Sequence, residues 1–153
     1  MTKFQETVEI LAPPESVWKV LSDPTYIPKL YRDAISVELD PPGPAAVGHR
    51  CTVHGRVGGL RVASTVEYTK VEKEKCIAGA GLPGGMFSVF FQEVSLTRKG
   101  WDTEVKISFE YQVLPEYATK VPEPALVEKM LSESFRGYGR SLKELSELVP
   151  LAE

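Results

Sequence analysis

A chain of 153 residues is long enough for a single domain, 1–153, and its 42% hydrophobic content is sufficient for a buried core. The net charge of −3, without a basic cluster, argues against nucleic-acid binding, and no apolar run reaches the ~18 residues of a membrane span. The first ten residues lack the apolar core of an export signal, and two cysteines are too few for a disulfide framework, so we expect a reduced, cytoplasmic protein.

The N-terminal part of the chain predicts one strand followed by two short helices. Residues 4–10 alternate between apolar and polar side chains, which is typical of a half-buried strand. A pair of prolines ends this strand and suits the first turn of a helix that runs to about Ser22. An Asp-Pro pair ends that helix, and a second short helix is expected over 25–31.

The middle of the chain predicts a series of strands joined by short turns. The expected strands are 35–39, 49–57, 60–70, 75–81, 86–98 and 101–113. The connections between most of them are short and rich in glycine, proline or charged residues, which favours antiparallel hairpins. We therefore expect one antiparallel sheet with an apolar face that must be covered.

The segment 124–149 predicts a long helix that supplies this cover. Its apolar residues recur every three or four positions as one stripe, formed by Leu131, Phe135, Tyr138, Leu142, Leu145 and Leu148. Gly137 and Gly139 lie inside this helix, either because of close packing or because they leave room for a ligand beside Tyr138. A curved sheet around one helix is expected to leave a gap, with the short helices closing one end.

The inward positions of the sheet and helix carry many aromatic side chains and a few polar ones. The candidate ligand-binding residues are Leu30, Tyr31, Val62, Ser64, Phe90, Gln92, Phe109, Tyr111, Phe135 and Tyr138. Buried hydroxyl and amide groups need hydrogen-bond partners, and an apolar pocket with a few polar groups is the usual form of a small-molecule site. The same aromatic set also fits plain core packing, so both interpretations stay open.

No sequence pattern indicates a metal, a cofactor or a catalytic residue. His49 and His54 are the only histidines, and their spacing in one strand points them to opposite faces, which argues against a shared metal site. There is no Gly-x-Ser-x-Gly elbow. The glycine-rich run 79–85 lacks the lysine and the strand-to-helix context of a phosphate loop, so a flexible hairpin is the expected structure.

Several short motifs resemble the START-like superfamily, also called SRPBCC. They are Ala12-Pro13-Pro14-Glu15-Ser16-Val17-Trp18 with Leu21-Ser22-Asp23-Pro24, Val47-Gly48-His49-Arg50, Val66-Glu67-Tyr68, Thr103-Glu104-Val105 and Arg140-Ser141-Leu142-Lys143-Glu144-Leu145. The resemblance implies an α+β helix-grip fold, in which a curved seven-stranded antiparallel sheet wraps around a long C-terminal helix and leaves a cavity for a hydrophobic molecule. It points to the polyketide cyclase/dehydrase-like branch, while Val57-Gly58-Gly59-Leu60 resembles the accessory protein of carbon monoxide dehydrogenase.

Three functions are compatible with this resemblance, because the fold serves carriers, enzymes and interaction modules. The first is binding or transport of a small hydrophobic ligand, lipid- or polyketide-like, without catalysis. The second is a cyclase- or hydrolase-type enzyme that needs an acid or base in the cavity, for which Glu67, Glu110 and His54 are the candidates. The third is a protein-interaction module, which would have a collapsed cavity and an exposed apolar patch.

Three apolar residues of one expected strand raise the question of a homodimer. In a regular strand Phe87, Val89 and Phe91 would lie on the face opposite Phe90. Either a second copy of the chain covers them as a homodimer, or a bulge in the strand changes their direction.

Overall fold

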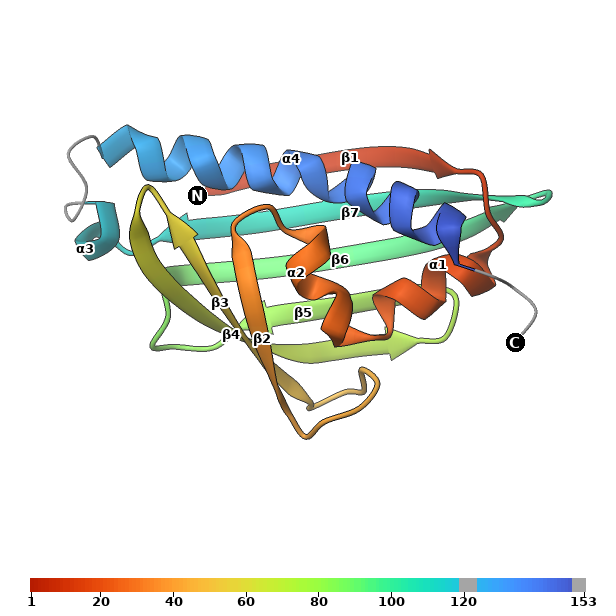
Figure 1. The fold of residues 1–153 in the computed structure, drawn as a ribbon, viewed down its shortest axis with the longest axis horizontal. Helices are drawn as coiled ribbons and strands as arrows, with labels where there is room; N and C mark the ends of the chain where they lie inside the picture. Colours follow the sequence, from red (N-terminus) through yellow and green to blue (C-terminus); the bar gives the residue numbers. More distant parts are fainter. Residues whose placement is uncertain (119–123, 150–153) are drawn as a thin grey trace.

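The computed structural model describes residues 1–118 and 124–149, and these residues form the expected α+β architecture (Figure 1). The strands are β1 (Thr2–Ile10), β2 (Ala34–Asp40), β3 (Arg50–Val57), β4 (Leu60–Glu72), β5 (Cys76–Gly81), β6 (Phe87–Lys99) and β7 (Asp102–Val113). The helices are α1 (Pro14–Leu21), α2 (Ile27–Leu30), α3 (Pro115–Ala118) and α4 (Pro124–Leu148), with a 3-10 turn, η1 (Pro24–Tyr26), before α2.

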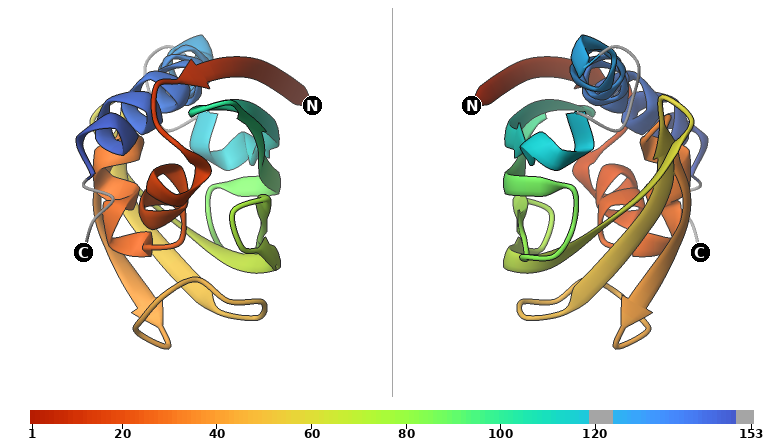
Figure 2. Two further views of the ribbon diagram at one scale, coloured as in Figure 1. Left: turned by 90° about the vertical axis from the view of Figure 1, so that its right-hand side faces the viewer. Right: turned by 90° about the vertical axis from the view of Figure 1, so that its left-hand side faces the viewer.

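The strands form a seven-stranded sheet in the order β1-β7-β6-β5-β4-β3-β2, and every neighbouring pair is antiparallel. Figure 2 shows the sheet bending from β1 round to β2, with α4 across its concave side and α1 and α2 at one end. Helix α4 contacts β1, β3 and β7 as well as α1 and α2. The predicted helix-grip arrangement is therefore confirmed.

Two polar side chains near α1 fix the entry to and exit from this helix. The buried Thr103 hydroxyl donates to the Ala12 carbonyl at 2.7 Å, which ties the chain before α1 to β7. At the other end, Asp23 Oδ1 accepts hydrogen bonds from the backbone N–H of Thr25 at 3.1 Å and from its hydroxyl at 2.7 Å. This cap begins η1, which leads directly into α2. The last residue of α2, Leu30, is buried.

The apolar stripe of α4 faces the sheet over most of the helix. Leu131, Phe135, Tyr138 and Leu142 are buried, whereas Leu148, in the last turn, is 79% exposed. Burying large side chains of this kind contributes about 1.5–3 kcal/mol each, so the first four residues supply much of the adhesion between helix and sheet.

The two glycines of α4 have different surroundings. A Cβ at Gly139 would lie 2.8 Å from Val8 Cγ2 and 3.0 Å from Glu6 Oε2, so the missing side chain lets β1 approach the helix. A Cβ at Gly137 would meet nothing within 4 Å. Neither glycine lines the cavity described below, so Gly139 serves close packing and the interpretation that these glycines leave room for a ligand is wrong.

A β-bulge in β6 decides the direction of Phe87. The pairing of β6 with β7 shifts between Phe87 and Val89. As a result Phe87 turns inward, where its ring lies 5.1 Å from that of Phe90, measured between centroids. Phe91 stays on the outer face and is 51% exposed. Of the two alternatives for this apolar group, the structure therefore shows the bulge.

Candidate functional site: a cavity between the sheet and the long helix

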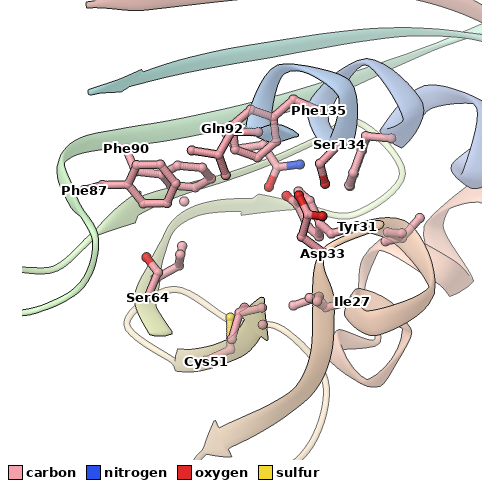
Figure 3. A pocket seen from close by; sticks show the side chains of 18 of the residues that line it. Ile27, Tyr31, Asp33, Cys51, Ser64, Phe87, Phe90, Gln92, Ser134 and Phe135 are labelled. Carbon is pink, nitrogen blue, oxygen red and sulfur yellow. The ribbon is translucent and has the colours of Figure 1, made fainter. Parts of the chain in front are cut away.

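A cavity of about 130 Å³ lies between the curved sheet and α4 (Figure 3). Residues of α1, α2, β2, β3, β4, β5, β6 and α4 contribute to its wall. Most of the wall is apolar, with Val62, Phe87, Phe90 and Phe135 among its members. The two short helices border the cavity through residues such as Val20 and Leu30, as the sequence predicted.

Two residues of strand β5, Gly79 and Gly81, have no side chain and let neighbouring side chains approach the strand closely. A Cβ at Gly79 would lie 2.7 Å from Val66 Cγ1, and one at Gly81 would lie 3.0 Å from Phe90 Cβ. The side chains of Val66 and Phe90 therefore lie over β5 and form the wall there. These glycines belong to a paired strand, and the turn predicted for 79–85 is confined to the residues after it.

Most of the predicted ligand-binding residues meet at this cavity. Those that line it are Leu30, Tyr31, Val62, Ser64, Phe90, Gln92, Phe135 and Tyr138. Phe109 and Tyr111 face inward but pack on Phe135, with ring centroids 4.5 Å and 4.8 Å from it, and neither lines the cavity. The Tyr111 hydroxyl donates instead to the Glu128 carboxylate at 3.1 Å, and burial raises the pKa of Tyr111 to about 12.

Polar side chains gather at the part of the cavity beside α4 and the α2–β2 turn, where Figure 3 shows Tyr31, Asp33, Gln92 and Ser134 close together. Burial raises the pKa of both Tyr31 and Tyr138 above the usual range, and the nearby Gln92 side chain acts against this rise in each. Gln92 therefore lies close to both tyrosine hydroxyls. Its amide nitrogen, Nε2, is nevertheless buried without a hydrogen-bond partner.

Asp33 is an acidic cavity residue that the sequence analysis did not find. Burial raises the pKa of its carboxyl, while Arg32 and a hydrogen bond with Ser134 lower it and Glu133 raises it. One carboxylate oxygen, Oδ2, is buried without a partner. Asp33 lies in the turn between α2 and β2, where no periodic pattern assigns a side chain to either face.

The backbone of Asp33 is held in place by β3. The carbonyl oxygen of Asp33 accepts a hydrogen bond from the backbone N–H of Arg56 at 3.0 Å. A Cβ at Gly55 would lie 2.3 Å from that oxygen, so this approach requires glycine. The carboxyl group is thus placed at the cavity by a close backbone contact.

Cys51 and Tyr68 also line the cavity and were missed in the sequence analysis. Tyr68 shares the inward face of β4 with Val62, Ser64 and Val66, so the alternation of that strand contained the information needed to find it. Burial raises the pKa of Cys51 to about 11, against a hydrogen bond with Tyr68 that lowers it. The Cys51 thiol therefore stays protonated at neutral pH and is a poor nucleophile.

The three acid or base candidates of the enzyme hypothesis do not line the cavity. Their partners are Arg50 for Glu67 at 3.0 Å, Lys3 for Glu110 at 3.1 Å, and Glu38 for His54 at 3.2 Å. Each lies on the outer face of its strand, as the alternation of the neighbouring residues requires.

The described residues contain neither a metal-binding cluster nor a membrane-spanning helix. Within 1–118 and 124–149, no group of three or more histidine, cysteine, aspartate or glutamate residues is arranged to hold a metal ion. None of the helices described for this chain is long and apolar enough to cross a membrane.

Residues 1–149 match the family described as polyketide cyclase / dehydrase and lipid transport. Among solved structures, the protein TTHA0849 from Thermus thermophilus is 20% identical over 95% of this chain and 97% of that chain, with a TM-score of 0.73. A START superfamily protein from Mycobacterium smegmatis is 18% identical over 95% and 97%, with a TM-score of 0.71. The Zhui aromatase/cyclase from Streptomyces sp. R1128 is 17% identical over 95% and 91%, with a TM-score of 0.69. No curated protein sequence matches the chain. At these identities the structural likeness shows the shared fold.

Proposed function

The chain belongs to the polyketide cyclase / dehydrase and lipid transport family, and we propose that it binds a small hydrophobic molecule in the cavity between the sheet and α4. The observation that carries this proposal is the cavity itself. Protein interiors are close-packed and contain few voids larger than a water molecule, so a space of about 130 Å³ with a mostly apolar wall needs a reason. An apolar wall with a few polar groups is the usual form of a small-molecule site.

The remaining hypotheses of the sequence analysis receive less support. The interaction module requires a collapsed cavity, and the cavity is open. The interaction hypothesis also relied on an exposed apolar patch formed by Phe87, Val89 and Phe91. The bulge in β6 turns Phe87 inward, so this residue does not belong to such a patch. Glu67, Glu110 and His54 lie outside the cavity, so none of them supplies the acid or base that an enzyme would need there.

One observation favours a second candidate function, an enzyme of cyclase type in the same cavity. Asp33 is a carboxyl in the cavity wall whose pKa burial raises, and a carboxyl group in such a place is a candidate general acid or base. If the mass of a bound molecule changes during incubation with the protein, the result supports an enzyme. A molecule recovered unchanged supports binding alone.

The binding proposal is tested by filling the cavity with a side chain. Toluene is a suitable apolar probe, and its binding is followed through the amide NMR signals of cavity residues such as Gln92 and Phe135. In Ser64→Phe a new ring occupies part of the cavity, so we expect toluene affinity to fall at least tenfold. Ser36→Phe is the matched control, because Ser36 is exposed on β2 and its replacement leaves the cavity unchanged.

The result can contradict the proposal in two ways. Toluene that fails to move the signals of cavity residues in the wild-type protein would show that the space takes no apolar ligand. Equal losses of affinity in Ser64→Phe and Ser36→Phe would place the binding outside the cavity. Native mass spectrometry of the purified protein, before and after extraction with denaturant, then identifies any natural ligand that is retained.

A further inference from the structure

We propose that the ligand is a compact, single-ring aromatic compound with one neutral hydroxyl group, and that Gln92 and Asp33 bind this hydroxyl. The proposal rests on the proposed function, because it specifies the chemistry of a molecule bound in the same cavity. Three observations carry it: the size of the space, the nature of its wall, and two buried polar atoms without partners.

The cavity volume matches a small ligand. An apolar protein cavity of about 150 Å³ is large enough to bind benzene. The space of about 130 Å³ found here therefore holds one aromatic ring with a small substituent. A long acyl chain or a fused polycyclic molecule requires a much larger space.

The wall of the cavity suits a flat ring. Phe87, Phe90 and Phe135 surround one another with centroid distances of 5.1 Å, 6.0 Å and 6.5 Å, and their planes are tilted by 34° to 53°. Tyr31 extends this group, with its ring 6.1 Å from that of Phe135 at an angle of 83°. Aromatic rings prefer such tilted or offset contacts at 4.5–7 Å, so a ligand ring gains the same kind of contact here.

The two unpartnered atoms define the polar group of the ligand. Gln92 Nε2 is a buried donor and Asp33 Oδ2 a buried acceptor, and neither has a hydrogen-bond partner in the protein. Native proteins pair almost all buried polar groups, so an unpaired donor and an unpaired acceptor at one cavity point to a missing partner. A hydroxyl group can accept from Gln92 and donate to Asp33 through a single oxygen atom.

The charge at this end of the cavity excludes the main alternatives. A ligand carboxylate would meet the carboxyl of Asp33, and like charges in a partly buried site repel each other. A ligand ammonium would suit Asp33 but has no lone pair to accept from Gln92. A neutral hydroxyl on the ring satisfies both residues.

The site is also built to keep Asp33 in this position. The carbonyl of Asp33 is bonded to Arg56 N–H on β3, and Gly55 permits that approach. The backbone of Gln92 is held in β6, which pairs with β5 at Gly79 and with β7 at Phe109. The backbones of both residues therefore have defined positions before a ligand arrives, which lowers the entropy cost of binding.

The test compares phenol with toluene, which has almost the same shape but no hydroxyl. NMR titration of the wild-type protein should give an affinity for phenol about tenfold higher than for toluene, a difference of about 1.4 kcal/mol. In an apolar cavity the order is reversed, because burying a hydroxyl without a partner is costly. Gln92→Met keeps the length of the side chain and removes the donor, so the preference for phenol over toluene should become smaller, with Asp33 left as the remaining partner of the hydroxyl.

Glu93→Met is the matched control, since Glu93 is the next residue of β6 and is exposed on the outer face. It should keep the wild-type preference for phenol. The proposal is overturned if wild-type protein binds toluene as tightly as phenol, which would mean that water suffices for the two polar atoms. It is also overturned if the preference for phenol in Gln92→Met is as large as in the wild-type protein. Should Gln92→Met not fold, the wild-type comparison decides alone. If toluene binds and phenol is not preferred, the proposed binding function is still supported and only the hydroxyl proposal is contradicted. If neither probe binds, both proposals are contradicted.

Discussion

The carboxyl group of Asp33 is kept in the cavity wall at a cost to stability. Burial has the largest effect on the pKa of this carboxyl, and it raises the pKa because it favours the protonated form. Arg32 and Ser134 reduce this effect, and neither removes it. A residue that costs stability and lines a cavity is better explained by binding or chemistry than by packing.

The cost at Asp33 should depend on pH in a defined direction. A carboxyl whose pKa is higher in the folded than in the unfolded protein binds more protons in the folded state, so the folded protein loses stability as pH rises through this range. Asp33→Asn removes that loss. The variant should therefore gain stability relative to the wild-type protein as pH rises above the ordinary pKa of an aspartate, as measured by urea unfolding at a series of pH values. Glu93→Gln, an exposed change, should show no such trend, and an equal trend in both variants would contradict this account of Asp33.

At the residue scale, the inward direction of a side chain was predictable where it lies in a regular strand or helix. Ser64 and Gln92 were placed by the alternation of their strands, and Phe135 and Tyr138 by the helical stripe. Asp33 could not be placed in this way, because it lies in a turn whose position is set by a distant contact with Gly55. The chemistry proposed here therefore depends partly on a residue that sequence periodicity does not assign.

Among the secondary-structure elements, α4 shows how one helix can contain two glycines with opposite effects. Gly139→Ala should destabilise the protein by about 1 kcal/mol, because overpacking of about 1–3 kcal/mol against Val8 exceeds the ~1 kcal/mol gained in helix propensity. Gly137→Ala adds a methyl group where nothing lies within 4 Å, so it should stabilise by about 0.5–1 kcal/mol. Urea unfolding of the two variants measures both changes. Changes of the same sign would show that the contact between α4 and β1 is looser than described.

The order and type of most elements were predictable because each of these has a strong local pattern, whereas the four-residue helix α3 was not predicted. Periods of two and of three to four residues identified the strands and α4, and the Asp-Pro pair identified the end of α1. The bulge at Phe87 was one of two alternatives, since a pattern of apolar residues does not show where a strand gains an extra residue. The shape of the cavity wall depends on such details, so its composition was only partly predictable.

For the molecule as a whole, the cavity links ligand binding to the stability of the fold. A ligand that binds only the folded state stabilises it by an amount that grows with the logarithm of ligand concentration, about 2.7 kcal/mol at a hundredfold excess over Kd. Phenol and toluene should therefore raise the unfolding temperature of wild-type protein and of Ser36→Phe. Ser64→Phe should show a much smaller rise, and an equal rise in all three proteins would indicate binding elsewhere.

The volume of the cavity is a property of the whole molecule that the sequence did not reveal. It depends on the distance between α4 and the curved sheet, and small shifts of either element change it greatly. The resemblance to a family with internal cavities predicted that a space exists, and the structure adds its size and the identity of its polar groups.

The bulge in β6 also has a consequence for how such a protein evolves. Because side chains alternate along a strand, one additional residue is enough to turn Phe87 from the outer face into the cavity. Deletion of a single codon, that of Ser88, would restore the regular pairing and turn Phe87 outward again. A lineage with this fold can thus gain or lose an aromatic wall of its binding site through one insertion or deletion, without passing through any substitution of the aromatic residue itself.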